Sequence, residues 1–202
     1  MIAVTTKRMR ILTGAEAKSV LKNEKVIRLR MNPEPKDDGR SKCRLLLMGH
    51  LTPYEWTYSR NDAPTPQPST FRQLMAMGAE DPQDDCVGIG DVSTAYLNGV
   101  KYGSSQPRKF VKFRKHKRAE WIVMEMTGAI YGGDDGAIDW YDTADEYLQG
   151  AGFKKSDNEL CLWRHPVTKL KVTAHSDDVA VRGRCQDVEE FFKTRHKHYP
   201  LK

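Results

Sequence analysis

The stretch Lys171-Val-Thr-Ala-His-Ser-Asp-Asp-Val-Ala-Val181 has apolar residues alternating on both sides of a polar break of four residues. This pattern predicts two short strands joined by a tight turn, with the adjacent carboxylates of Asp177 and Asp178 at its tip. Mg²⁺ binds a few carboxylate oxygens and keeps its other positions for water and phosphate, so an exposed pair on a hairpin suits phosphoryl chemistry. Adjacent Asp residues also occur at 37–38, 84–85 and 134–135, where Asp favours turns, so a purely structural turn is the alternative.

Length and composition predict a soluble globular protein with one domain, or one domain and an appendage. The chain has 202 residues, of which 39% are hydrophobic, and this is enough to bury a core. No apolar run is long enough to span a membrane, and no apolar segment follows the basic residues 7–10 as in a secretory signal. We therefore expect an intracellular protein, in the cytoplasm or the nucleus, without a membrane partner.

The four cysteines are far apart in the sequence and lack the spacing of metal ligands. This argues against a zinc site and a disulfide framework, and it predicts reduced thiols in the core. The residues are Cys43, Cys86, Cys161 and Cys185.

The positive charge is concentrated in one segment, residues 108–118, which we call the basic segment. It contains seven Lys or Arg residues and no acid, and without these seven the formal net charge of +6 becomes −1. Phe110 and Phe113 lie between the cations, so the segment can follow a phosphate backbone while its rings pack or stack on bases. The alternative is a solvated loop that the two rings anchor to the core. The cations are Arg108, Lys109, Lys112, Arg114, Lys115, Lys117 and Arg118.

Upstream of residue 86 the pattern predicts a hairpin between two helices. Residues 1–24 are weakly patterned apart from a short helix over 15–22, so we expect an appendage there. Strands over 26–31 and 42–48 form the hairpin, and Lys42 and Arg44 share one face of its second strand, over a cleft or on a solvated surface. A capping box at Thr70 opens a second helix, ended by Gly78. Its expected buried residues are Phe71, Leu74 and Met75.

From residue 86 onward the predicted order of elements is β-α-β-α-β-β-β-α. A strand over 86–91 ends in Asp91 and precedes a helix over 92–97, so Asp91 is either a helix cap or a metal ligand. A strand over 121–125 and a helix over 137–148, ended by Gly150 and Gly152, come next. Strands over 160–164 and 170–174 lead into the Asp177-Asp178 hairpin, and a capping box of Asp187 and Glu190 opens the last helix.

Several motifs resemble those of copia-type retrotransposon reverse transcriptases, in the same order. Asp91-Val-Ser-Thr-Ala-Tyr-Leu-Asn-Gly99 resembles their Asp-Val-Lys-Thr-Ala-Phe-Leu-Asn-Gly, and His175-Ser-Asp-Asp178 stands where they carry Tyr-Val-Asp-Asp. Several motifs in the right order are more specific than any one of them, so the chain resembles this family over residues 25–202. The other matching stretches are Lys42–Gly49, Thr57–Ser59, Ile130–Gly132 with Trp140-Tyr141, and Gly152–Ser156.

The resemblance implies an α+β fold with the fingers and palm of a right-hand polymerase, in which helices back an antiparallel palm sheet and the thumb is absent. It implies an appendage at 1–24, a fingers-palm domain at 25–202 cut before the thumb, and integrase and ribonuclease H domains elsewhere in a polyprotein. The implied activity is RNA-directed DNA synthesis, with an RNA template, a DNA primer and deoxynucleoside triphosphates as partners.

The resemblance also assigns site residues. Asp91 and Asp177 would hold two Mg²⁺ or Mn²⁺ ions, assisted by Asp178, because cations stabilise the negative charge of phosphoryl transfer. Lys42 and Arg44 would contact the triphosphate. The nucleotide would lie above Ser93, Thr94 and Ala95, with its sugar on Tyr96, for which a place in the core is the alternative.

Residues 133–138 depart from the family pattern. The family has Lys and Arg where this chain has Asp134 and Ile138. The two added carboxylates, Asp134 and Asp135, oppose the binding of a polyanion unless solvent screens them. A degenerate copy that binds nucleic acid without polymerising it is therefore one alternative. Another is a small RNA-binding module of the RRM type, which is disfavoured because Pro107 and Lys109 stand where that motif needs Gly or Ala.

Overall fold

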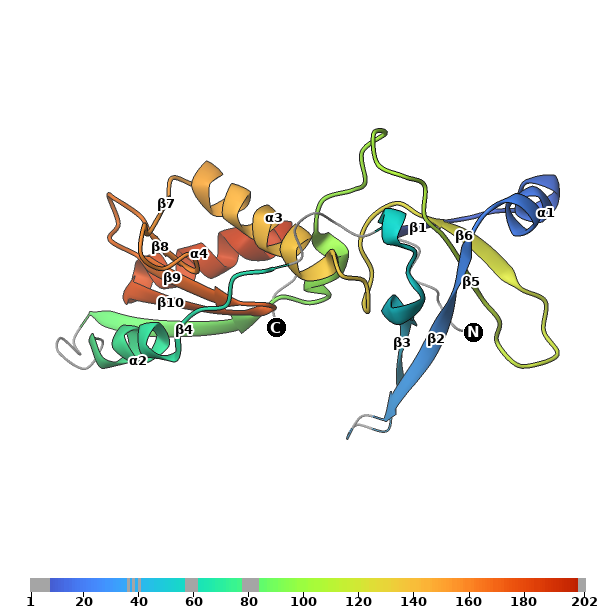
Figure 1. The fold of residues 1–202 in the computed structure, drawn as a ribbon. Helices are drawn as coiled ribbons and strands as arrows, with labels where there is room; N and C mark the ends of the chain where they lie inside the picture. The colour runs from blue at the N-terminus through green and yellow to red at the C-terminus, as the bar shows by residue number, and fades with distance from the viewer. Residues whose placement is uncertain are drawn as a thin grey trace. The chain divides into compact units, whose positions relative to one another are not determined.

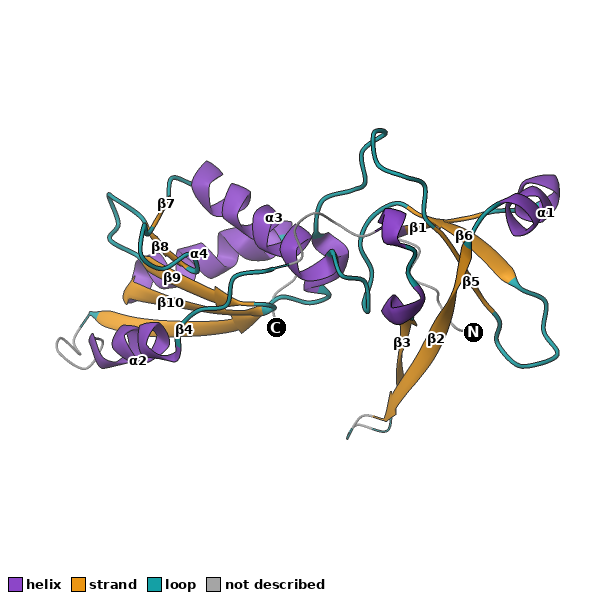
Figure 2. Ribbon diagram, viewed as in Figure 1, coloured by secondary structure: helices purple, strands orange, loops and turns teal. Residues whose placement is uncertain are grey.

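The computed structural model describes residues 8–35, 37, 39, 41–56, 62–77 and 84–199, apart from the side chains of residues 41, 42 and 77. The chain forms two compact units, the first of Met1–Asn61 and Gly99–Asp139 and the second of Asp62–Asn98 and Trp140–Lys202. The described residues contain four α-helices and two five-stranded sheets. Figure 2 colours the helices purple and the strands orange. The mixed α+β class predicted from the sequence is therefore confirmed. The expected motif at 57–59 and the expected helix end at Gly78 lie outside the described residues.

The first unit is built on a sheet with the strand order β1-β6-β5-β2-β3 (Figure 1). β2 and β5 run parallel, and the other neighbours are antiparallel. Helix α1, Gly14–Asn23, contributes Val20 to a core with Leu12, Phe110 and Val123. The strands are β1 Met9–Ile11, β2 Val26–Pro35, β3 Ser41–Leu47, β5 Phe110–Phe113 and β6 Ile122–Met126, and short 3₁₀ turns follow at Gly49–Leu51 and Tyr54–Trp56.

The predictions for the first unit are confirmed for α1, β6 and the β2–β3 hairpin, in which Met31 faces Leu45. β5 was not expected as a strand. Cations lie within it and on both sides of it, namely Lys109, Lys112 and Arg114, and such a run is also typical of a solvated loop. Gly132 is required where the chain returns past β3, since it has φ +85° and a Cβ there would lie 2.3 Å from the Leu47 carbonyl oxygen.

The second unit is built on an antiparallel sheet with the order β4-β10-β9-β8-β7. Its strands are β4 Asp85–Asp91, β7 Lys154–Lys155, β8 Leu162–Arg164, β9 Lys171–His175 and β10 Asp178–Arg184. Figure 1 shows α3, Gly136–Gly150, and α4, Cys185–His198, on one side of this sheet and α2, Pro68–Met77, on the other. α4 lies close to β4 at Gly88, where an added Cβ would come within 2.8 Å of Val188.

The two-residue period of the strands gives this sheet two different faces. Trp163, Val172 and Val181 are cross-strand neighbours on the face toward α4, and each is at most 1% exposed. On β10 the opposite face carries Asp178 at the start of the strand and Arg182 four residues later. One end of that face is therefore acidic and the other is basic.

The central hairpin is as predicted, with β9 and β10 joined by the two-residue loop Ser176-Asp177. The expected helices α3 and α4 and the strands β4, β8 and β9 are also confirmed. α3 ends as predicted at its glycines, because Gly152 adopts φ +89° and its N–H donates to the Gln149 carbonyl.

The helix expected over 92–97 is wrong. Residues 92–94 form a bridge and a turn, and only Ala95–Asn98 is helical, as a 3₁₀ helix. Thr94 has φ 57°, a left-handed conformation that stops an α-helix from starting at Val92.

Both predicted capping boxes are also wrong. α2 begins at Pro68, a residue suited to the first helical position, and the Thr70 hydroxyl donates to Glu159 instead. α4 begins at Cys185, and the Asp187 carboxylate accepts a hydrogen bond from Arg184. In α2 Leu74 is buried as expected, whereas Phe71 is 41% exposed.

Within the described residues all four cysteines are free, and they are not all in the core. Cys161 is buried, Cys86 and Cys185 are half-buried, and Cys43 is exposed on β3. None of the described helices has the length and apolar character needed to cross a bilayer.

Candidate active site

Two carboxylates face each other at one end of the second unit's sheet. Asp91, the last residue of β4, is directly opposite Asp178, the first residue of β10. The Val92 N–H donates to the Asp177 carbonyl at 2.7 Å, which makes Asp91 and Asp178 a non-hydrogen-bonded pair with Cα atoms about 4.5 Å apart. Like charges in that arrangement repel, so this end of the sheet favours a cation.

The turn that carries Asp177 is held from three directions. The Tyr96 hydroxyl and the Ser176 hydroxyl are hydrogen-bonded at 2.9 Å, and Trp140 Nε1 donates to the Ser176 carbonyl at 2.7 Å. The backbone bond from Val92 is the third contact. Ser176 itself has φ 57°. The carboxylates of Asp177 and Asp178 remain exposed on this fixed turn.

The arrangement of the side chains decides whether this site can hold the expected metal. Among the described residues no group of three or more His, Cys, Asp or Glu side chains is placed to hold a metal ion. Mg²⁺ at a phosphate site needs only one or two carboxylates, and water and phosphate oxygens complete its coordination. The facing pair Asp91 and Asp178 meets that smaller requirement.

The residues expected beneath the nucleotide follow Asp91 directly and belong to the same unit. Ala95 is buried, Ser93 and Tyr96 are half-buried and Thr94 is exposed. The Ser93 carbonyl accepts a hydrogen bond from the Asn98 side chain at 3.1 Å. Tyr96 therefore has its hydroxyl bound to the hairpin tip rather than its whole ring in the core.

Lys42 and Arg44, the residues expected at the triphosphate, lie in β3 of the first unit. The Arg44 guanidinium forms an ion pair with Glu34 on the neighbouring strand and lies 5.8 Å from the Tyr131 ring centroid. The side chain of Lys42 is outside what the structure describes.

A family model described as "Reverse transcriptase (RNA-dependent DNA polymerase)" matches residues 13–202. The chain belongs to the reverse transcriptase family.

Two solved telomerase structures are similar to this chain. The one from Candida albicans, in complex with a fragment of telomeric RNA, has a TM-score of 0.49 and 8% identity, covering 96% of this chain and 44% of that one. The apo enzyme from Candida tropicalis, truncated from its C-terminal domain, has a TM-score of 0.48 and 8% identity, covering 96% of this chain and 50% of that one. The chain thus spans about half the length of these proteins, and no curated protein matches it.

The basic segment divides into buried and exposed parts. Phe110 and Phe113 are 2% and 1% exposed, so both rings belong to the core and neither is presented to a base. The Arg108 guanidinium pairs with Glu125 at 2.6 Å. Lys115, Lys117 and Arg118 are exposed in the loop after β5.

Lys109 differs from the other cations of the segment because its ammonium is buried. It pairs with Asp135 at 2.8 Å, and the two side chains are 7% and 5% exposed. The Tyr102 hydroxyl donates to the same carboxylate at 2.5 Å. Asp135, one of the two carboxylates expected to repel a polyanion, is therefore neutralised within its own unit, and only Asp134 is exposed.

Two tryptophans take part in these arrangements without having been singled out for a role from the sequence. Trp140 fixes the hairpin tip, and its position in a motif shared with the family was the only signal. The half-buried ring of Trp121 is approached by Arg28, Lys112 and Arg114, at 5.4, 5.3 and 4.5 Å from its centroid. Only the fold reveals this second cluster, because Arg28 comes from a distant strand.

Proposed function

We propose that the chain is the reverse transcriptase domain of a copia-type retrotransposon, which adds deoxynucleotides to a primer 3′ end on an RNA or DNA template. The observation that supports it most is the facing pair Asp91 and Asp178 beside a fixed turn that carries Asp177. Three carboxylates at one sheet end suit phosphoryl transfer, which needs cations where charge develops and no covalent intermediate.

In this proposal the second compact unit is the palm and the first is the fingers. Residues 1–24 are an appendage to a fingers-palm domain of 25–202, and their described part packs on the sheet of the first unit. The partners are an RNA template, a DNA primer and deoxynucleoside triphosphates. Integrase and ribonuclease H domains would belong to the same polyprotein.

The carboxylates of Asp91 and Asp177 are the proposed ligands of two Mg²⁺ or Mn²⁺ ions, with Asp178 at the rim. When bound, such ions supply activation of the primer 3′-hydroxyl and neutralisation of the triphosphate. The protein's own part is to hold the turn still, through Tyr96, Trp140 and Val92, so that the carboxylates need no reorganisation during the reaction.

Lys42 and Arg44 are the proposed triphosphate contacts, on the strength of the family resemblance, and Ser93, Thr94 and Ala95 lie under the nucleotide. Tyr96 is the proposed support of its sugar, where the ring would collide with a 2′-hydroxyl. Tyr96→Ala should therefore admit ribonucleotides, whereas Tyr96→Phe, which keeps the ring and removes the hydroxyl bonded to Ser176, should keep the exclusion. Incorporation of ribonucleotides against deoxyribonucleotides measures this, and unchanged selectivity in Tyr96→Ala would refute the role.

Nucleic acid is the proposed partner of the basic segment, through Arg108, Lys112, Arg114, Lys115, Lys117 and Arg118. Lys109 belonged to the same prediction, but its buried pair with Asp135 favours a structural role. The second candidate function is a degenerate copy that binds nucleic acid without polymerising it. It is favoured by the lack of a preformed three-ligand metal group among the described residues.

Primer extension on an RNA template with Mg²⁺ or Mn²⁺ tests the proposal. Asp91→Asn and Asp177→Asn should each lower the rate by on the order of 10³-fold, since each removes several kcal/mol of charge stabilisation. Asp178→Asn should matter less, and Asp157→Asn, an exposed change in another turn, is the matched control.

The results of primer extension distinguish the active polymerase from the degenerate copy. No extension by the parent protein, with RNA binding retained, would establish the degenerate copy. A larger loss in Asp178→Asn than in Asp177→Asn would make the facing pair, rather than the turn carboxylate, the principal metal ligands.

A further inference from the structure

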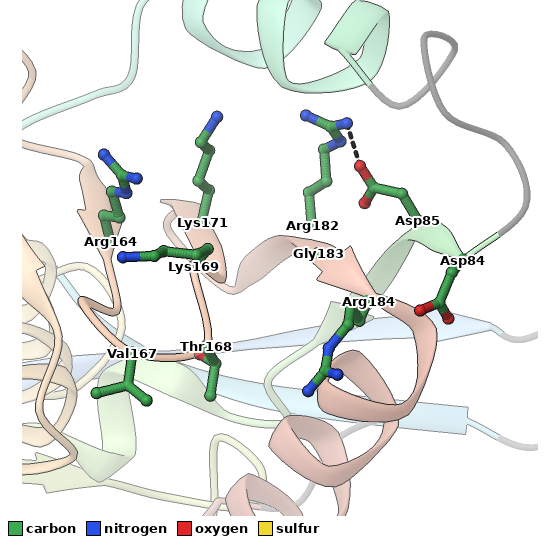
Figure 3. A pocket seen from close by; sticks show the side chains of 10 residues that line it. All are labelled: Asp84, Asp85, Arg164, Val167, Thr168, Lys169, Lys171, Arg182, Gly183 and Arg184. Carbon is green, nitrogen blue, oxygen red and sulfur yellow. Dashed lines mark hydrogen bonds and ion pairs between the residues drawn. The ribbon is translucent and has the colours of Figure 1, made fainter.

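A basic groove lies at the other end of the second unit's sheet, away from Asp91. It has a volume of about 690 Å³ and is formed by the ends of β4 and β10 and the turn between β8 and β9 (Figure 3). Five cations line it, against two carboxylates, Asp84 and Asp85. The cations are Arg164, Lys169, Lys171, Arg182 and Arg184.

Three of these cations form a row across neighbouring strands. Arg164 is directly opposite Lys171, and Lys171 is directly opposite Arg182. Strands lie about 4.8 Å apart, so the row places three positive charges within about 10 Å. Like charges directly opposite each other destabilise a sheet, so an anion bound over this row would stabilise it.

Described carboxylates pair with two of the five cations. Asp85 forms an ion pair with Arg182, and Arg184 pairs with Asp187 at 2.9 Å. Burial, and then repulsion from Arg182 and Arg164, lowers the pKa of Lys171. A bound anion would relieve that repulsion.

The side chains of the groove indicate which anion fits. Guanidinium groups bind phosphate oxygens through paired N–H donors, and lysine adds a point charge. None of the described residues that line the groove is aromatic, so the groove offers no ring for a base to stack on. It therefore suits the phosphates of a ligand rather than its bases.

The groove shares a sheet face with the proposed catalytic carboxylates. On β10 Asp178 and Arg182 are four residues apart, so both side chains project from the same face, about 13 Å from each other along the strand. Between them Ala180 and Thr173 are buried, whereas Ile89 on the neighbouring strand β4 is 65% exposed, so this face is open along β4. A polyanion at the carboxylate end is within reach of the cations.

We propose that this groove is a second phosphate-binding site, which takes the phosphodiester backbone of the nucleic acid away from the point of polymerisation. That the bound polyanion is a nucleic acid rests on the proposed function. That the groove binds phosphate does not. The groove holds the strand by charge and leaves its sequence unread.

The test is RNA binding by the full chain, measured by fluorescence anisotropy over a range of salt concentrations without divalent metal. Arg164→Gln with Lys171→Gln should lower the log-log salt slope by about 1.4, or about 0.7 for each single-strand phosphate contact. The control is Lys18→Gln with Lys22→Gln, which removes the same charge from exposed positions on α1. A slope that falls no further than in this control would overturn the proposal.

Two further measurements keep the result interpretable. In the unaltered protein RNA should protect Lys169 and Lys171 from amine-reactive labelling, and a lack of protection counts against the site even if the double variant folds poorly. Protection by pyrophosphate but not by RNA would mean a site for small phosphates only, and would also overturn the proposal. Binding without metal is independent of primer extension, so the loss of extension in Asp91→Asn leaves this test unaffected.

Discussion

Charged residues in this chain occur in two contrasting arrangements. On the face of the second unit's sheet opposite α4, Asp91 faces Asp178, and Lys171 has a cation on each side. In the first unit Lys109 instead pairs with Asp135, and both are buried. Opposite charges in contact satisfy each other within the fold, whereas like charges that face each other repel, and a ligand of opposite charge relieves that repulsion. The arrangement of a charge thus separates structural from functional roles better than the residue type does.

Asp145 in the second unit is a further example of the structural kind. Burial would raise the pKa of this carboxyl, but hydrogen bonds from Lys155, Gln149 and Trp163 outweigh it, and the net pKa is lowered. The Trp163 indole donates to it at 2.8 Å. Every partner of Asp145 comes from within the unit, so it offers nothing to a ligand.

The strongest test of this contrast is the removal of one partner of a buried pair. Lys109→Ala leaves Asp135 buried without its cation, so the free energy of unfolding should fall by about 3–5 kcal/mol in a urea titration. Lys117→Ala, an exposed position in the same segment, should change it by less than about 0.5 kcal/mol. Equal effects of the two substitutions would remove the distinction between structural and functional cations.

The basic segment provides a smaller effect, on binding rather than on stability. Neutralising Lys112, Arg114 and Lys115 together should flatten the salt dependence of RNA binding, by about 0.7 log-log units for each phosphate that the segment no longer binds. Affinity should fall equally for all sequences, because phosphates carry no sequence information. An unchanged slope in the salt titration would mean that the segment is a solvated loop.

The smallest effect is expected at the facing carboxylates themselves. Without metal, Asp91→Asn should raise the free energy of unfolding by about 0.2–1 kcal/mol, because it removes repulsion from Asp178. Asp157→Asn is again the control. A loss of stability in Asp91→Asn would show that this carboxylate has a structural role, and its loss of activity would then need another explanation.

Much of the second unit could be predicted from local pattern. The alternation on both sides of Ser176-Asp177 specifies the hairpin, and the glycines after Leu148 specify the end of α3. The carboxylates at Asp91 and Asp178 were placed at the ends of strands from the same pattern. That they face each other depends on the register between β4 and β10, which are far apart in the chain.

The misses have physical causes that a local pattern does not contain. The Thr70 hydroxyl binds Glu159, a residue 89 positions away, and so it does not cap its own helix. The burial of Lys109 depends on Asp135 from another segment. The basic groove was missed because its cations are scattered over residues 164–184 and only the pairing of three strands aligns them.

The shared strand β10 has a consequence for how this protein tolerates changes in length. Asp178 and Arg182 project from the same face because they are separated by an even number of residues, and a register shift of one residue exchanges the two faces of a strand. The insertion or deletion of a single codon at Ser176-Asp177 that shifts β10 by one residue would turn the side chains of Asp178 and Arg182 toward α4. The same shift would bring Val179 and Val181 to the face that Asp178 and Arg182 now occupy. The loop at 114–121 joins β5 to β6 and tolerates such a change, because it carries neither group. We therefore expect natural selection to constrain the length of the turn at 176–177 more tightly than the identity of Ser176.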